Sequence, residues 1–276
     1  MILKYDLKNG IMQRAVWLLL PIVIFLIALY RISSYAAFDD YGMNLGKCLL
    51  IALAGTVSIE SVGKHFFVPM LWLVIQLGSV LFTLEYPLRD LNLFGRQIIV
   101  RCEKRYQWWL SKCVWCLLSV WIYWLIGIIM MVVFCLIRGF PLSLTIDSET
   151  AASVLTEFDT DFTFMASGKA FWLLILVPMT MSALLCMLQM LISLLKNEIT
   201  ALCVSVIFII WSMCSLNPIA FLNYAMMQRL SLFYHDGMNV FGGFAAALIM
   251  IVCCVLAGID AFNRMDILEI KKNEAN

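Results

Sequence analysis

The sequence predicts an all-α membrane protein with six transmembrane helices. Hydrophobic residues make up 63% of its 276 residues and charged residues only 13%, and the mean hydropathy is +0.95. That composition leaves too little polar surface to cover a soluble globule. Apolar runs with almost no charge recur along the chain, at or near the roughly 20 residues that a spanning helix needs. The expected spans are 15–32, 66–85, 113–137, 170–195, 199–216 and 237–260.

The first span has a short apolar run, which we expect to continue from an amphipathic N-terminal helix. Lys4, Lys8 and Arg14 can keep their charges in headgroups or water on that flank. A cleaved signal peptide is the competing interpretation, because a basic start is followed by an apolar core. The residues after Tyr30 lack the small-residue cleavage pattern, so we expect the segment to remain as a span.

The charges of the loops predict the orientation. Segment 86–112 carries six basic and two acidic residues, and short loops rich in Lys and Arg stay on the cytoplasmic side of a bilayer. With six spans, both termini are then cytoplasmic. Segment 138–169 becomes the largest outer loop, and it is acidic through Asp147, Glu149, Glu157, Asp159 and Asp161.

Two further apolar stretches are too short or too interrupted to span. Stretch 48–59 is only about a dozen residues long, against the roughly 20 that a span needs. Because a span there would invert every later loop, we expect a short helix lying on the outer face or dipping into it. Segment 218–236 follows the helix-ending Asn217–Pro218 and is mostly apolar around Arg229. It predicts an outer re-entrant elbow packed against the helices.

Motifs for common chemistry are missing from the sequence. Gly42–Lys47 is the nearest approach to a phosphate-binding loop, but its spacing is wrong and no hydroxyl follows the lysine. Two histidines, His65 and His235, exclude a multi-histidine metal cluster. Cys113 and Cys116 have redox spacing, yet they open a spanning helix and are expected to pack in the core. The net charge of +1 says nothing about nucleic acid, because the basic residues lie where a loop at the inner face needs them, and no nucleic-acid partner is expected.

A few polar residues lie within or beside the apolar runs. The main amides are Gln76, Gln189 and Asn217. Buried amides join helices to one another in membranes, or they line a path for a substrate, and both interpretations stay open. The runs hold no mid-membrane charge, which argues against a carrier driven by protons.

Segment 86–112 also has the pattern of an amphipathic element along the inner face. Tyr86–Pro87 is expected to end the second span, Leu88–Phe94 to form a short helix and Gly95 to turn the chain. The residues that follow have basic and apolar faces at helical spacing, which predicts Trp108–Trp109 at headgroup level. Such an element either docks a soluble partner or serves only as a membrane anchor.

Two stretches of the chain resemble a known family. Tyr86-Pro87-Leu88-Arg89-Asp90-Leu91, followed by Gly95-Arg96-Gln97 and Trp108-Trp109-Leu110-Ser111-Lys112, is similar to a loop in the permease subunits of bacterial ABC transporters of the ABC-2 export type. The closing Phe262-Asn263-Arg264-Met265-Asp266-Ile267 resembles the aromatic, basic and acidic end of the same permeases. The six-span plan, the amphipathic N-terminus and the outer elbow extend the resemblance over most of the chain.

The resemblance implies a half-transporter that pairs with a second permease, identical or related, and with two separate ATPase subunits. Those subunits would bind ATP and Mg²⁺, which fits the missing phosphate loop, and no cofactor is expected in this chain. In that family a coupling helix between spans two and three sits in a cleft of the ATPase. Here it maps to Leu88–Gln97, with the N-terminal segment as a second contact. The expected coupling residues, some of which could instead meet lipid phosphate, are Arg89, Asp90, Leu91, Gly95 and Arg96.

The resemblance also implies a location in the bacterial cytoplasmic membrane. A chain rich in Met and aromatic residues, with acidic outer loops, favours a hydrophobic or cationic peptide as the cargo. Two other classes stay open. A non-transporting membrane partner, such as an immunity or sensor subunit, would keep the same helices. An intramembrane enzyme would need a nucleophile and base, or paired carboxylates, at one depth, and the apolar runs offer neither.

Overall fold

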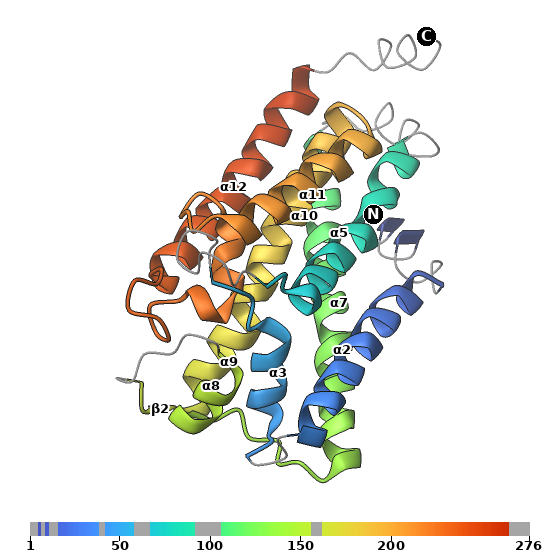
Figure 1. The fold of residues 1–276 in the computed structure, drawn as a ribbon. Helices are drawn as coiled ribbons and strands as arrows, with labels where there is room; N and C mark the ends of the chain where they lie inside the picture. Colours follow the sequence, from blue (N-terminus) through green and yellow to red (C-terminus); the bar gives the residue numbers. More distant parts are fainter. Residues whose placement is uncertain are drawn as a thin grey trace.

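The structure is a computed structural model, and it describes residues 5–6, 9–10, 16–38, 42–57, 67–91, 106–155 and 162–264. Within this part of the chain, long helices run side by side as an elongated bundle (Figure 1). The described strands are two short ones, β1 (Ile146–Asp147) and β2 (Phe164–Met165), which pair antiparallel. The all-α class predicted from the sequence is therefore confirmed.

Five helical segments of the described chain are long and apolar enough to cross a bilayer. The first is Val16–Phe38, which contains α2 (Leu19–Phe38). The others are α5 (Met70–Asp90), α7 (Tyr106–Arg138), Ser167–Leu195 and α12 (Val240–Arg264). A further apolar helix, α11 (Glu198–Cys214), has 17 residues and so a length of about 25 Å. The chain is thus a multi-pass membrane protein, and the predicted count of six spans depends on α11.

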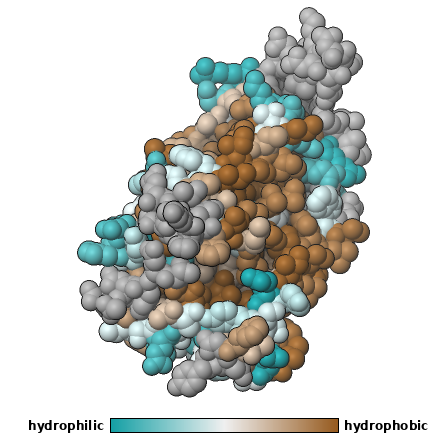
Figure 2. All heavy atoms as spheres, in the orientation of Figure 1, coloured by the Kyte–Doolittle hydropathy of each residue, from teal (hydrophilic) through white to brown (hydrophobic). Residues whose placement is uncertain are grey.

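The segment Ser167–Leu195 forms the centre of the bundle. It consists of α9 (Ser167–Phe171), a π-helical stretch η3 (Trp172–Leu176) and α10 (Val177–Leu195). Helix α10 packs against α5, α7, α11 and α12. In the most apolar stretch of this segment 67% of the residues are buried, compared with 22% in the corresponding stretch of α12. The outward faces of the surrounding helices are apolar, and Figure 2 shows a broad hydrophobic band over the bundle, as contact with lipid requires.

The first helix extends further than the sequence predicts. Helix α2 continues beyond residue 32 to Phe38. No Pro or Gly interrupts the stretch that follows Arg31. The Oγ of Ser34 donates to the carbonyl of Tyr30 at 3.0 Å, which satisfies this polar side chain within the helix.

The helix ends beside segment 86–112 also correct the prediction. Tyr86–Pro87 does not end the second span, because α5 runs through it to Asp90. Pro87 lies in the last turn, where it removes a single backbone hydrogen bond. Helix α7 (Tyr106–Arg138) already includes residues before the predicted span start at 113. Both ends of the predicted loop are therefore helical, and residues 92–105 lie outside the described part of the chain.

The predicted short helix in stretch 48–59 is observed as α3 (Leu45–Leu53), which has nine residues. Residues 58–59 lie outside the described part. The side chain of Asn44 accepts a hydrogen bond from the Lys47 amide at 2.7 Å and so begins the helix. Every residue of α3 except Ile51 is buried, so the helix is part of the protein interior. Its Cys48 Sγ lies 3.9 Å from the Sγ of Cys135 near the end of α7.

The described part of segment 138–169 is folded. Asp147 precedes α8 (Ser148–Val154), and its side chain accepts from the Thr150 amide at 2.7 Å. Hydrogen bonds from the side chain and backbone of Thr150 hold the pKa of Asp147 below its ordinary value. Helix α8 packs against α3, at the opposite end of the bundle from the C-terminal end of α12 (Figure 1). Of the predicted acidic residues, Glu157, Asp159 and Asp161 lie outside the described residues.

The predicted elbow at 218–236 consists of two 3₁₀ helices, η4 (Phe221–Ala225) and η5 (Met227–Arg229), whose residues are all buried. Arg229 is 1% exposed. It donates to the Thr56 carbonyl at 2.7 Å and to the Met213 carbonyl at 2.5 Å, and also to the Ser212 carbonyl. Burial lowers the pKa of Arg229 to about 10, so the group remains a cation at neutral pH. It therefore ties the elbow to the carboxyl end of α11, where a positive charge is favoured.

Replacing Arg229 with Met should destabilise the bundle. The substitution leaves buried carbonyl groups without their donor, at a cost of about 2–5 kcal/mol. Thermal unfolding in detergent, followed by tryptophan fluorescence, should show a clearly lower midpoint than in the wild-type chain. Arg138→Met, at an exposed position, is the matched control and should leave the midpoint unchanged. Equal midpoints for both variants would contradict the anchoring role of Arg229.

Candidate functional site

A cluster of three buried charges lies where α5 ends and α7 begins. The side chain of Lys112 is fully buried, and its Nζ lies 2.6 Å from Oδ2 of Asp90. The same Nζ forms an ion pair with Asp6 of the N-terminal segment. Both carboxylates are almost completely buried as well. One cation thus connects three segments of the chain at one end of the bundle.

Helical spacing brings the cluster together. Tyr86 and Asp90 are four residues apart on α5, and Trp108, Ser111 and Lys112 share one face of α7. A carboxylate at the carboxyl end of a helix is disfavoured by the helix dipole, so Asp90 needs a nearby cation. Lys112, seven residues into α7, supplies that charge.

The buried polar atoms of the cluster have partners. Asp6 accepts hydrogen bonds from the Tyr86 hydroxyl at 2.9 Å and from the Ser111 hydroxyl. Asp90 accepts from the Trp108 indole at 3.3 Å. The ammonium of Lys112 also lies over the ring of Tyr86, 4.6 Å from its centroid. Buried charges are tolerated in this way only when they are paired and hydrogen-bonded, and removing one partner is strongly destabilising.

The cluster is joined to α12 through two tryptophans. Trp108 and Trp109, which the sequence predicts at headgroup level, are both fully buried inside the protein. The ring of Trp109 stacks on Phe262 with centroids 5.4 Å apart, and its indole donates to the Val255 carbonyl at 2.9 Å. Gly258 makes this approach possible, because a Cβ there would lie 2.1 Å from the Trp109 ring. Both residues belong to α7, and both rings face Phe262 of α12.

The predicted coupling residues do not form one surface. Arg89 is exposed over 58% of its side chain and pairs with Glu85 at 3.1 Å. Asp90 and Leu91 are instead buried, at 6% and 2% exposure. Gly95 and Arg96 lie outside the described residues. Among the described members of the set, Arg89 is therefore the one available to a partner, while Asp90 is used inside the protein.

Two of the predicted path residues, Gln76 and Gln189, lie in the contact between α5 and α10. Gln76 on α5 accepts from the Ser182 hydroxyl of α10 at 2.8 Å. Gln189 on α10 donates to the Val80 carbonyl of α5 at 3.2 Å. These contacts favour the interpretation of both amides as links between packed helices. Asn217 lies elsewhere, at the start of the elbow, where its side chain accepts from the Ile219 amide at 2.9 Å.

Sequence reasoning missed Asp6 and Lys112. Lys112 stands directly before an apolar run, and Asp6 lies between basic residues in the N-terminal segment. The available signal was a lysine directly before a long charge-free run. Its two partners, Asp6 and Asp90, are remote from it in the sequence, so the signal did not identify them. Of the two histidines, His235 is exposed in the elbow region, and His65 is outside the described residues.

Comparisons with family models, with curated proteins and with solved structures gave no match.

Removing the cation of the cluster should destabilise the protein. In Lys112→Met two buried carboxylates lose their counter-ion, which costs about 3–5 kcal/mol. The thermal midpoint of the purified chain should fall clearly, and adding Asp6→Asn and Asp90→Asn to the same variant should recover part of the loss. Lys196→Met, an exposed lysine beyond α10, is the control. A Lys112→Met chain as stable as this control would show that the cluster does not hold these segments together.

Proposed function

We propose that this chain is the permease subunit of an ABC-2 type exporter in the bacterial cytoplasmic membrane. The observation that carries the proposal is the ion cluster of Asp6, Asp90 and Lys112. Asp90 and Lys112 flank residues 92–105, which carry most of the charges of the basic segment that resembles a coupling region. The resemblance of the basic segment to a coupling region, and its attachment to α5 and α7, support the role of a permease subunit.

The cluster suits a chain that receives motion from a separate motor. A segment transmits force only if both of its ends are held to the elements that must move. Here one end is attached to α5 and the other to α7, and the Lys112 pairs hold these helices together. Asp6 adds the N-terminal segment, the second expected contact of an ATPase. A push on residues 92–105 would therefore reach three parts of the bundle together.

The residues of the coupling segment then divide into two roles. Arg89 is exposed and remains a proposed contact of the ATPase, together with Arg96 and the turn at Gly95. Asp90 and Leu91 are proposed to position the segment, because both are buried. The missing phosphate loop supports the proposal that the partner subunit binds ATP and Mg²⁺ and that this chain does not hydrolyse ATP.

The proposed topology has six spans, with α11 as the fifth. The ends of α5 and α12 and the starts of α7 and α11 lie at one end of the bundle (Figure 1). The basic segment joins this end, so we assign it to the cytoplasm together with both termini. At about 25 Å, α11 would cross a bilayer that is slightly thinned around it.

The proposed path lies between two permease chains. Helices α5 and α10 are packed closely through Gln76 and Gln189, which supports a path outside the centre of a single chain. The proposed cargo is a hydrophobic or cationic peptide. It is supported by the acidic Asp147 and Glu149 at the end of the bundle that we assign to the outer face.

The test is co-expression of this chain with its cognate ATPase, followed by co-purification. Changing Arg89 and Arg96 together to Glu would place repelling charges at the contact, at a cost of about 2–5 kcal/mol if the pairs are buried. We expect the amount of ATPase subunit recovered with the membrane chain to fall more than tenfold. We also expect this chain to lose its stimulation of ATP hydrolysis by that subunit. Membrane insertion should persist, because other basic residues remain in the segment.

The matched control is the double variant Arg138→Glu and Lys169→Glu, which makes the same change of charge at the other end of the bundle. It should bind the ATPase as the wild-type chain does. Wild-type binding and export by the Arg89 and Arg96 variant would mean that the segment is a lipid anchor. ATP hydrolysis by the isolated chain would also reject the proposal.

A further inference from the structure

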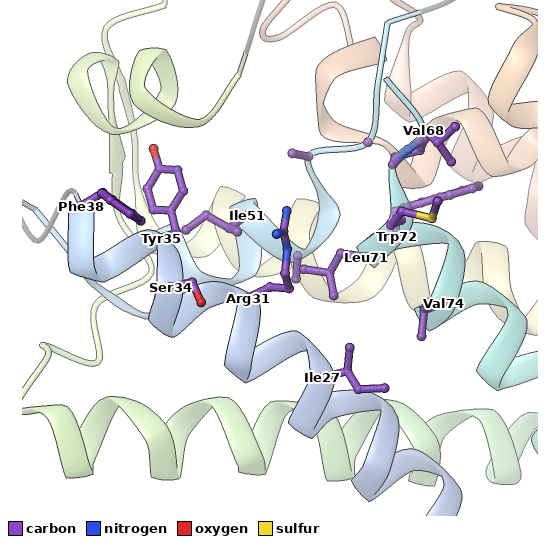
Figure 3. A pocket seen from close by; sticks show the side chains of 15 residues that line it. Ile27, Arg31, Ser34, Tyr35, Phe38, Ile51, Val68, Leu71, Trp72 and Val74 are labelled. Carbon is purple, nitrogen blue, oxygen red and sulfur yellow. The ribbon is translucent and has the colours of Figure 1, made fainter. Parts of the chain in front are cut away.

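A groove of about 510 Å³ lies between α2, α3 and the beginning of α5. Figure 3 shows Arg31 of α2 pointing into the space beside Ile51 and Leu71, with Tyr35 nearer the end of α2 and Ile27 on the other side of Arg31. This groove lies apart from the ion cluster, which is at the other end of α5. Its side chains come from parts of the chain that the proposed function does not use.

The groove has a polar end and an apolar end. Ser34 and Tyr35 line it beside Arg31, and Ile27 and Val74 line it farther along α2 and α5 (Figure 3). The hydroxyl groups are already used: Ser34 donates to the Tyr30 carbonyl at 3.0 Å and Tyr35 to the Ser153 carbonyl. Within the described part of the chain, Arg31 has neither an ion pair nor a hydrogen bond of its side chain. A free guanidinium is thus left at the polar end.

The position of Arg31 along α2 fits the level of lipid phosphates. It is the first charge after the apolar run that ends at Tyr30. Below it, the apolar side chains of Val23, Leu26 and Ile27 are 53%, 52% and 47% exposed, as expected for a face in contact with lipid. An arginine at the edge of such a face is costly unless an anion or water meets it. Phosphate suits it well, because guanidinium groups bind phosphate oxygens in a bidentate manner.

We propose that this groove binds one anionic phospholipid of the membrane. The phosphate lies against Arg31, and an acyl chain lies along Ile27, Leu71 and Val74. The cation of Arg31 matches the phosphate of such a lipid, and the apolar walls of the groove match its acyl chain. The inference requires only that the chain resides in a membrane, so it stands or falls independently of transport and of any ATPase.

Native mass spectrometry of the chain from nanodiscs of phosphatidylglycerol and phosphatidylethanolamine tests this site. The wild-type chain should retain one phosphatidylglycerol, and Arg31→Gln should reduce its occupancy at least fivefold. Arg31→Lys should retain more of the lipid than Arg31→Gln, because it keeps the charge but loses the bidentate geometry. Arg138→Gln removes an exposed cation at the same end of the bundle and should behave as the wild-type chain.

A second variant tests the apolar end with Arg31 intact. Val74→Trp fills the groove and should also lower the occupancy of phosphatidylglycerol, whether or not the Arg31 variants are stable. Equal occupancy in the wild type, Arg31→Gln and Val74→Trp would overturn the proposal. An equal loss in Arg138→Gln would indicate general surface charge and would overturn it too. Displacement of the lipid by an equal concentration of inorganic phosphate would identify a phosphate site instead of a lipid site.

Discussion

The ion pairs of Lys112 with Asp6 and Asp90 are the constraint on which the arrangement of the described helices at this end of the bundle depends. Charges buried in a medium of low dielectric are tolerated only if each has a partner. Lys112 therefore cannot move away from α5 or from the N-terminal segment without leaving a buried charge exposed to an apolar surrounding. The neighbouring Trp108 and Trp109 extend this fixed arrangement to α12 through Phe262.

A similar solution stabilises the other end of the bundle. Apolar packing alone gives helices in a membrane little specificity, because lipid tails are as apolar as the helix surfaces. Arg229 fixes the elbow by donating to carbonyl groups of α11 and of residue Thr56. Between the two ends, Gln76 and Ser182 join α5 to α10. Polar contacts at three levels thus select one arrangement of helices whose surfaces are otherwise alike.

Hydropathy was sufficient to predict the class and the location of the long helices, because each apolar run is longer than a soluble helix needs. It failed at the helix ends. A charge marks the limit of an apolar run, but a helix can continue past it: α5 continues past Glu85 to Asp90, and α7 includes the residues from Tyr106 that precede Lys112. Pro87 was misleading too, because a proline in the last turn of a helix removes only a single backbone hydrogen bond, and α5 continues through it to Asp90.

The candidate site was predictable only in part. Arg89 was expected on the surface and lies there, but Asp90 was expected beside it and turns inward. Adjacent residues on a helix point about 100° apart, so one sequence motif supplied both a surface residue and a core residue. Asp6 could not be matched with Lys112, because their side chains meet across 106 positions of the sequence. Such a pair is visible only when the fold is known.

A double-mutant cycle between Asp6 and Lys112 tests the central claim most directly. The free energies of unfolding of Asp6→Asn, Lys112→Met and the double variant give the energy of the interaction itself. If the cluster holds the N-terminal segment against α7, the two effects should be coupled by about 0.5–3 kcal/mol, the range found for residues in one hydrogen-bond or salt-bridge network. Additive effects, within about 0.5 kcal/mol, would contradict the account.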